Sequence, residues 1–243
     1  MRKSILSLFA LTLMVASLSG CGIIDYFYLP PSEDTAQELF ENGNDAMAEK
    51  DYMSAVEYYT KLRDEYPSSP YTLEAEISLG DAYFLDEEYI LAAEAYKDFE
   101  DMHPRHEAIP YVLNQIALSD MKSYRSIDRP TTALVEAVSY LERVQESYPN
   151  TEYAARAAEL IHACRTQIAQ HELYIADFYD RTGKYGAAWR RYAHVADNYS
   201  DLEEEYAYAQ QRGKLVYVKY LESLSLEERR KQEGSWKDYF DWL

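Results

Sequence analysis

Four side chains in two short stretches have the types and spacing that metal or acid–base chemistry needs. His103 and His106 are three residues apart, a separation that can bring two imidazoles to one metal ion. His103, however, stands at a position that tyrosine fills in three equivalent segments of the chain, so a packing role explains it better. His162 and Cys164 are two residues apart on a helical pattern and point to different sides of the helix. We predict no metal site, and a buried small apolar role for Cys164.

The sequence lacks the recurrent catalytic motifs and is strongly acidic. It contains no P-loop, no glycine-rich dinucleotide fingerprint, no His-Glu-x-x-His and no paired cysteine motif. The chain has 43 acidic against 24 basic residues, a net charge of −19, which becomes −21 without the first twenty residues and their Arg2 and Lys3. Such a surface repels nucleic acid and anionic headgroups over about 8 to 10 Å at ordinary salt. We therefore predict a protein that is not an enzyme, takes no cofactor and binds no nucleic acid.

The first twenty residues have the composition of a targeting signal. Arg2 and Lys3 precede an apolar run, Ile5 to Leu18, that is too short to span a bilayer comfortably. The run leads into Leu-Ser-Gly-Cys at Cys21, a motif similar to the bacterial lipobox, in which the signal is removed and the cysteine is acylated. Two or more acyl chains hold a domain stably on a membrane. We predict a signal peptide over 1–20 and lipid attachment at Cys21; the alternative is an ordinary secretory signal that ends near a cysteine.

The residues after Cys21 indicate where the protein is held. In bacterial lipoproteins an aspartate after the cysteine commonly signals retention at the inner membrane, and here that residue is Gly22. We therefore expect a lipid-anchored protein of the outer membrane that faces the periplasm. We predict a lipidated tether over 21–31. Residues 22–31 show no helical period and end in two prolines, which predicts a reach of about 33 to 36 Å and a helix N-cap at Ser32.

The order of residue types in Ala36–Pro67 returns in Leu73–Pro104, 37 residues later. In each unit a small residue is followed by alanine, an aromatic residue, an apolar residue and a closing proline at fixed intervals. This order is typical of tetratricopeptide repeats, in which two antiparallel helices stack on neighbouring pairs to cover their apolar face. The ladder occurs four times, as Ala55, Tyr59, Leu62 and Tyr66; Ala92, Tyr96, Phe99 and His103; Ala137, Leu141, Val144 and Tyr148; and Ala188, Tyr192, Val195 and Tyr199.

The predicted fold is all-α, a single tetratricopeptide (TPR) solenoid over residues 32–243 with about five repeats. Repeats 1 to 3 cover about 33–150 and repeats 4 and 5 about 151–243. The third repeat holds eight extra residues near 123–130, where Pro130 prevents a continuous helix. Residues 151–182 contain neither glycine nor proline, which leaves open one long helix or two with a short joint before Gly183.

The fifth repeat differs from the others at its end. It is expected to run from Leu202 to Leu224, with a second, short helix that begins near Leu226. The tail from Trp236 to Leu243 carries four aromatic residues. Terminal repeats need atypical faces and exposed apolar clusters mark interaction sites, so this tail is either a cap or a docking site.

The tyrosines suggest a second role besides packing. About three quarters of the 25 tyrosines are explained by core and helix-joint packing. The others are expected on a concave face built by the first helix of each repeat, where a tyrosine offers a rigid ring and one hydrogen-bonding group to an extended peptide. The predicted peptide-groove residues are Gln37, Phe40, Asn44, Met47, Glu74, Ile77, Asp81, Phe84, Tyr111, Asn114 and Met121.

Taken together, these motifs resemble the BamD family, the TPR lipoproteins of the outer-membrane β-barrel assembly (BAM) machinery. The likeness covers most of residues 30–225. It is carried by the lipobox at Cys21, the segments Tyr66–Tyr71, His103–His106 and Tyr111–Val112, the insertion Asp128–Pro130, the segment Tyr148–Tyr153, and the turn at Gly183.

The resemblance implies five repeats, no enzymatic activity and a set of protein partners. In the family, the C-terminal repeats dock onto the periplasmic domains of the barrel-forming, BamA-like subunit, and the N-terminal repeats meet unfolded outer-membrane protein segments. Other lipoproteins of the machinery are further partners. Carried over by this likeness, Arg191 matches a basic position that suits the barrel subunit, with Trp189 and Arg190 beside it. Asp197 stands where the family often has a basic residue, and Ser200 replaces the closing proline.

Two functions follow as hypotheses. The first is a lipid-anchored scaffold that joins the barrel assembly machinery and helps to receive unfolded barrel precursors. The alternative is another envelope TPR lipoprotein, an adaptor in peptidoglycan synthesis, cell division or pilus assembly. Depletion separates them, because loss of many outer-membrane barrels supports the first, and a pilus or division defect with normal barrels supports the second.

Overall fold

The computed structural model describes residues 34–224 and Glu228. Several predictions lie outside these residues: the signal peptide, lipid attachment at Cys21, the tether, the second helix near Leu226 and the aromatic tail. Ser32, the predicted N-cap, also lies outside. The first described helix is instead capped by Thr35, whose hydroxyl accepts a hydrogen bond from the backbone of Glu38 while the Glu38 carboxylate accepts one from the backbone of Thr35. This reciprocal pair is a capping box, and it begins the helix at Ala36.

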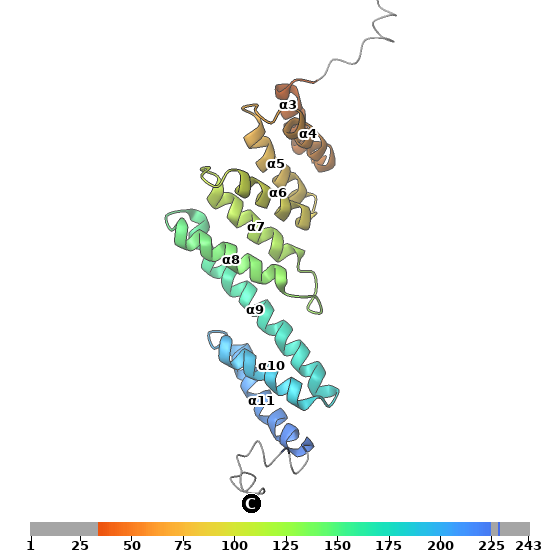
Figure 1. Ribbon diagram of the computed structural model, residues 1–243, viewed down its shortest axis with the longest axis vertical. Coiled ribbons are helices and arrows are strands. Elements are labelled where there is room, and N and C mark those ends of the chain that lie inside the picture. Colours follow the sequence, from red (N-terminus) through yellow and green to blue (C-terminus); the bar gives the residue numbers. More distant parts are fainter. Residues whose placement is uncertain (1–33, 225–227, 229–243) are drawn as a thin grey trace, which may run out of the picture.

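In the part of the chain that the structure describes, all regular structure is helical, and the helices are stacked along one long axis (Figure 1). Helices adjacent in sequence pack on each other throughout, and α7 with α9 and α9 with α11 also touch. The predicted TPR helical-hairpin solenoid is thus confirmed. The helices are α3 (Ala36–Glu49), α4 (Tyr52–Glu65), α5 (Thr72–Leu85), α6 (Tyr89–Met102), α7 (Ile109–Ser123), α8 (Thr132–Ser147), α9 (Glu152–Arg181), α10 (Tyr185–Asn198) and α11 (Glu203–Ser223).

The repeated ladder forms the buried side of the second helix in each pair. Its first three members are at most 1% exposed in all four units. Its fourth member is the C-cap in every unit, with φ between −128° and −132° for Tyr66, His103, Tyr148 and Tyr199. His103 therefore adopts the backbone conformation of the three tyrosines, and its ring packs 5.0 Å from that of Phe99.

In the first two units a tyrosine ring lies directly against a glycine of the preceding helix. A methyl group placed on Gly80 would lie 2.5 Å from Cε1 of Tyr96, and Gly43 stands in the same relation to Tyr59. The third unit uses a different pair, Ala117 with Leu141, at the same positions, and both residues are fully buried. Glycine in the first two units thus provides the space that a large ring needs.

The segment that the sequence left open, residues 151–182, forms one helix. At 30 residues, α9 is about 45 Å long. Its first half, through Ile168, packs in one hydrophobic cluster with α7 and α8. From Ala169 onward it packs in another cluster with α10 and α11. One helix therefore covers the third repeat and also serves as the first helix of the fourth.

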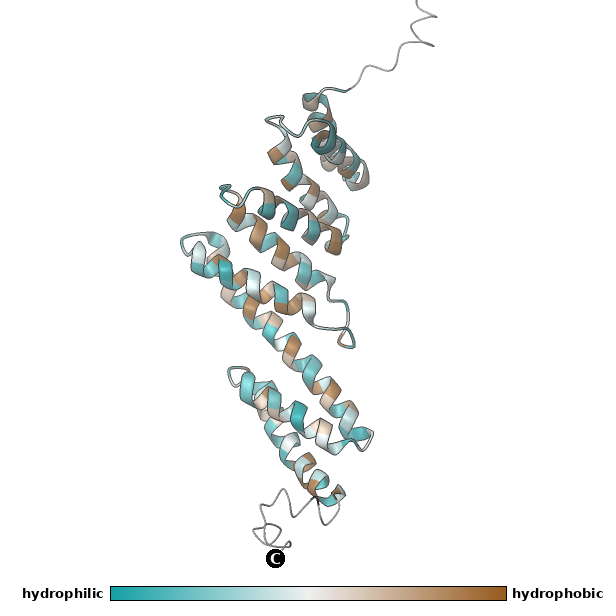
Figure 2. Cartoon of the chain, viewed as in Figure 1, coloured by the Kyte–Doolittle hydropathy of each residue, from teal (hydrophilic) through white to brown (hydrophobic). Residues whose placement is uncertain are grey.

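The core is divided into a chain of clusters, as expected of a solenoid. Four hydrophobic clusters follow one another along the stack, each formed by helices adjacent in sequence. Figure 2 shows hydrophobic and hydrophilic residues interspersed along the helices, as elements with one buried and one exposed side require. A search of the described helices for one with the length and apolar character needed to cross a membrane finds none.

One carboxylate is buried without adequate pairing. Asp120 is 6% exposed, and its Oδ2 has no hydrogen-bond partner within the described structure. Lys97 Nζ is 3.7 Å away and donates its hydrogen bond to Glu136 instead. Burial raises the pKa of the Asp120 carboxyl to about 6, against the smaller opposing effect of Lys97.

We expect Gly80→Ala to lower the free energy of unfolding by about 1 to 3 kcal/mol, because overpacking against Tyr96 outweighs the gain in helix propensity of at most about 1 kcal/mol. Adding Tyr96→Leu imitates the Ala117–Leu141 pair, so the double variant should lose less than the sum of the two single variants. Denaturant melts of the four proteins measure this coupling. If the two losses in the free energy of unfolding were additive, the ring of Tyr96 and the backbone of Gly80 would not be in contact.

The burial of Asp120 predicts an unusual pH dependence of the free energy of unfolding. The folded protein holds the Asp120 proton more tightly than the unfolded chain does, so the resulting stabilisation is present at low pH and is lost as pH rises through about 6. Asp120→Asn should therefore raise the free energy of unfolding by about 1 to 3 kcal/mol at pH 8 and change it little near pH 4. Denaturant unfolding of both proteins between pH 4 and pH 8 checks this prediction, and Asp101→Asn, at an exposed aspartate, is the control. Destabilisation at pH 8 would contradict the prediction.

Candidate protein-binding surfaces

The predicted groove residues lie on α3, α5 and α7, the first helices of the first three pairs. They differ in how much surface they offer. Gln37, Asn44 and Glu74 are exposed; Phe40, Met47, Ile77, Asp81, Phe84, Tyr111 and Met121 are half-buried; Asn114 is only 8% exposed.

Several of the half-buried groove residues also hold neighbouring helices together. The ring of Phe40 stacks on that of Tyr71, with centroids 5.4 Å apart, and lies 6.3 Å from that of Tyr59. Phe84 makes an edge contact with Tyr89 at 5.4 Å. These aromatic side chains are therefore fixed in position by packing, and each leaves part of its surface open.

Asp81 is the centre of the polar contacts on this side. It accepts hydrogen bonds from the hydroxyls of Tyr96, at 2.5 Å, and of Tyr111. Gln115 in turn donates to the hydroxyl of Tyr96 at 3.3 Å. Asp81 thereby joins α5, α6 and α7. Burial raises the pKa of both tyrosines, with the Asp81 charge adding to the effect, so the hydroxyls remain donors at any physiological pH.

The same tyrosine-to-acceptor bond recurs at one spacing in three repeats. The hydroxyl of the ladder tyrosine donates to a residue fifteen positions earlier, the one directly after the small residue of the first helix. The pairs are Tyr59 with Asn44, Tyr96 with Asp81, and Tyr192 with Asp177. Sequence reasoning missed this bond, although a small residue followed by Asp or Asn and then a tyrosine at this spacing is visible in the sequence. In the third unit the ladder residue is Leu141, and the bond is absent.

The second predicted surface lies on α10. Arg190 is exposed, and together with Arg191, His194, Glu172 and Tyr179 it lines an open hollow of about 430 Å³ between α9 and α10. The guanidinium of Arg191 donates to Oε2 of Glu172 at 2.5 Å. Arg191 is thus paired within the chain, while Arg190 makes no ion pair with any residue that the structure describes.

Trp189, predicted beside these arginines, is largely engaged inside the chain. Its ring stacks on that of Tyr220, at 6.2 Å with 9° between the planes, and lies 5.0 Å from that of Tyr217. Both tyrosines belong to α11. Trp189 therefore joins α10, the helix that carries both arginines, to α11.

A buried charge cluster fixes α11 to the rest of the stack. Asp180, 7% exposed, accepts hydrogen bonds from Arg212 at 2.7 Å and Lys219 at 2.8 Å, both on α11. The carboxylate comes from the last turn of α9, next to the turn at Gly183, whose φ is +76°. The C-terminal surface is thus built on elements held by one carboxylate and two cations.

His103 and Cys164, considered above for metal or acid–base chemistry, are held by contacts within the helical stack. His103 Nε2 lies 2.9 Å from Oε2 of Glu76, and within the described residues no group of three histidine, cysteine or acidic side chains could hold a metal ion. Cys164 is fully buried, as predicted, and burial raises the pKa of its thiol to about 11. Neither residue is placed to react, and the surfaces above present side chains suited to binding protein.

Comparisons with known proteins agree with the resemblance found in the sequence. The model of a family described as "YfiO: Outer membrane lipoprotein" matches residues 32–235. The outer membrane protein assembly factor BamD of Vibrio cholerae is 25% identical over 211 residues, which cover 83% of this chain and 85% of that protein. BamD of Neisseria meningitidis serogroup A is 24% identical over 209 residues, 82% of this chain and 78% of its own length. BamD of Caulobacter vibrioides is 26% identical over 191 residues, which cover 78% of this chain and 63% of that protein.

We expect Asp180→Asn to release α11 from the stack. The substitution replaces two charge-assisted bonds to a nearly buried carboxylate, and because Arg212 and Lys219 are 36% and 46% exposed, the loss should be about 1 to 3 kcal/mol of local stability. Hydrogen exchange should speed up in α11 and the end of α9 and stay unchanged in α3 to α6. The matched control is Asp201→Asn, whose partner Arg165 forms a more exposed pair worth about 0 to 1 kcal/mol. If α11 were equally protected from hydrogen exchange in Asp180→Asn and Asp201→Asn, Asp180 would not be the residue that holds α11.

Proposed function

Because the chain belongs to the YfiO/BamD family of outer membrane lipoproteins, we propose that it is a lipid-anchored periplasmic scaffold of the β-barrel assembly machinery. In this proposal it binds the tandem periplasmic domains of a BamA-like barrel-forming subunit and helps to receive unfolded outer-membrane proteins for insertion. The observation that carries the proposal is the family match, which extends over nearly all of the helical stack. A lipid on Cys21 would hold this stack at the outer membrane.

The C-terminal surface suits the barrel-forming subunit in this proposal. Arg190 is exposed and unpaired among the described residues, and His194 lies beside it. Glu172 is already occupied by Arg191, which leaves the guanidinium of Arg190 as the cation available to a partner carboxylate. The stack of Trp189 on α11 keeps this surface rigid, which lowers the entropic cost of binding.

The N-terminal repeats suit an extended substrate segment. Their first helices offer exposed amide and carboxylate groups, such as Gln37, Asn44 and Glu74, beside aromatic rings that packing has already fixed. Unfolded barrel strands carry unpaired backbone groups and alternate aromatic side chains, which such a surface can bind. Other lipoproteins of the machinery are further proposed partners.

The alternative, an adaptor in peptidoglycan synthesis, cell division or pilus assembly, uses the same kind of helical surface. The relatives named as outer membrane protein assembly factors favour the first function. Depletion in cells separates the two. Loss of many outer-membrane barrels at once supports barrel assembly, and a division or pilus defect with normal barrels supports the adaptor.

The partner surface is tested with Arg190→Glu. This change reverses one exposed charge and breaks no ion pair with any described residue, so the melting temperature should not move. Co-isolation of a protein with tandem periplasmic domains from solubilised membranes should fall at least tenfold. Arg105→Glu, an exposed arginine between α6 and α7, is the control and should leave recovery unchanged. Recovery of no such partner with the unmodified protein would overturn the proposed function.

A further inference from the structure

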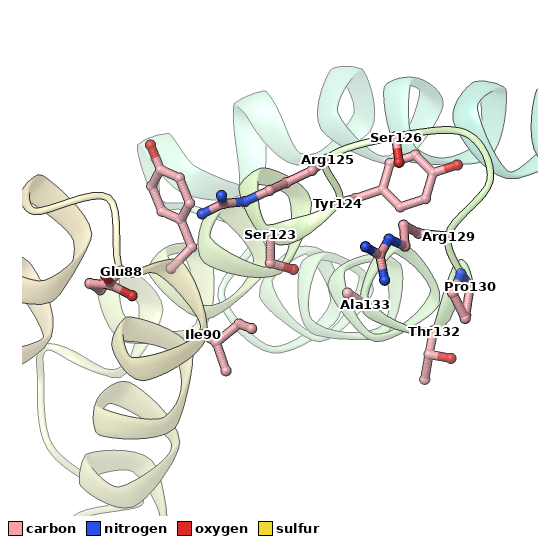
Figure 3. A pocket seen from close by; sticks show the side chains of 11 residues that line it. Glu88, Ile90, Ser123, Tyr124, Arg125, Ser126, Arg129, Pro130, Thr132 and Ala133 are labelled. Atoms are coloured by element: carbon pink, nitrogen blue, oxygen red, sulfur yellow. The ribbon is translucent and has the colours of Figure 1, made fainter.

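The insertion in the third repeat builds a hollow that the proposed function does not use. The loop 124–131 connects α7 to α8 and faces the beginning of α6, and between them lies a hollow of about 470 Å³ (Figure 3). Its wall includes Tyr89 and Ile90 from α6 and Arg125 and Arg129 from the loop. In Figure 3 the two arginine side chains extend from the loop on either side of Ser123.

The loop is tied to the rest of the protein. Nδ1 of His171, on α9, lies 2.6 Å from the carbonyl oxygen of Ile127, at the middle of the loop. Within the loop, the hydroxyl of Ser126 donates to the carboxylate of Asp128 at 2.5 Å. The arginines are therefore presented from an anchored segment.

The two arginines are exposed cations on the wall of this hollow, in a very acidic chain. Neither makes an ion pair with any residue that the structure describes, whereas Arg143, Arg165 and Arg212 each do. Two acidic side chains lie nearby: Glu88 lines the hollow, and Asp128 stays ionised, its pKa lowered by the hydrogen bond from Ser126 and further by the charge of Arg129. In a chain with a net charge of −19, one hollow thus carries two guanidinium groups that form no ion pair with a described residue.

Apolar surface surrounds these cations. Ile90, which lines the hollow, is 66% exposed, and Ile127, elsewhere on the loop, is 41% exposed. Nζ of Lys122 lies 5.7 Å from the centre of the Tyr89 ring and adds a third positive charge beside an aromatic side chain. The surface therefore combines guanidinium donors for carboxylates with aliphatic and aromatic groups for one apolar side chain.

We propose that this hollow binds an acidic segment of a partner protein, in which an aliphatic or aromatic side chain stands between two carboxylates. The carboxylates pair with Arg125 and Arg129, and the apolar side chain rests against Ile90 and Tyr89. An anionic membrane or a nucleic acid fits less well, because the strongly acidic chain repels an extended negative surface, while a peptide brings only its local charges. The proposal is independent of the partner of Arg190.

The test is a binding titration of the full chain, purified in detergent, with fluorescent peptides. The probe peptide has the core Asp-Phe-Glu between glycine and serine residues; the comparison peptides have Asn-Phe-Gln and Asp-Gly-Glu. The acidic aromatic peptide should bind best and lose affinity as salt rises from about 0.05 to 0.5 M. The double variant Arg125→Gln, Arg129→Gln should weaken binding of the acidic aromatic peptide at least tenfold. Ile90→Ser should weaken the same binding several-fold.

Matched controls use the same chemistry elsewhere on the chain. The exposed arginines Arg105 and Arg181, both changed to glutamine, and the exposed Met53, changed to serine, should leave peptide binding unchanged. Equal binding to the double variant, or equal binding of all three peptides, would overturn the proposal. So would capture of phosphatidylglycerol vesicles through Arg125 and Arg129 without peptide binding, which would assign the surface to a membrane.

Discussion

The contact between a tyrosine ring and a bare glycine backbone sets how closely the two helices of the first units approach. Gly43 and Gly80 leave the space that the rings of Tyr59 and Tyr96 fill. Because each ring is fully enclosed, its hydroxyl must find an acceptor, and the residue directly after the glycine supplies it. One spacing in the sequence thus fixes both the apolar and the polar part of the helix pair.

Both ends of the stack use aromatic contacts between helices, such as Phe40 on Tyr71 and Trp189 on Tyr220, and the C-terminal end adds ion pairs. At the C-terminal end a nearly buried carboxylate, Asp180, binds two cations from α11. The acidic excess of the chain therefore has a structural use, since Asp180, Asp177 and Asp81 all serve as acceptors that join neighbouring helices.

The sequence predicted the repeats because ladder residues are selected by burial at a fixed helical period, and a period can be read without knowing the fold. It also predicted the loop of the third repeat, since Pro130 stops a helix wherever it occurs. It could not decide between one helix and two over 151–182, because the apolar positions keep the same period across Ile168 and Ala169 although they face different neighbours. The change of neighbour is a tertiary property.

The candidate surfaces were predictable only as sets of helix positions. Periodicity assigns Phe40 and Trp189 to a side of a helix, but only the three-dimensional arrangement shows that rings of other helices cover much of each. The pairing of Arg191 with Glu172 likewise depends on where α9 and α10 cross. The Thr-x-x-Glu sequence of the capping box at Thr35 could have been read from the sequence, but the N-cap was predicted at Ser32, which lies outside the described residues.

Helix α9 has a mechanical consequence. Since its two halves belong to different clusters, the third and fourth repeats share one rigid rod, and neither can turn about the stack without twisting or bending 30 residues of continuous backbone. A molecule bound at α10 therefore keeps a nearly constant distance and angle to one bound at α7 or α8. Between these two repeats the protein acts as a strut.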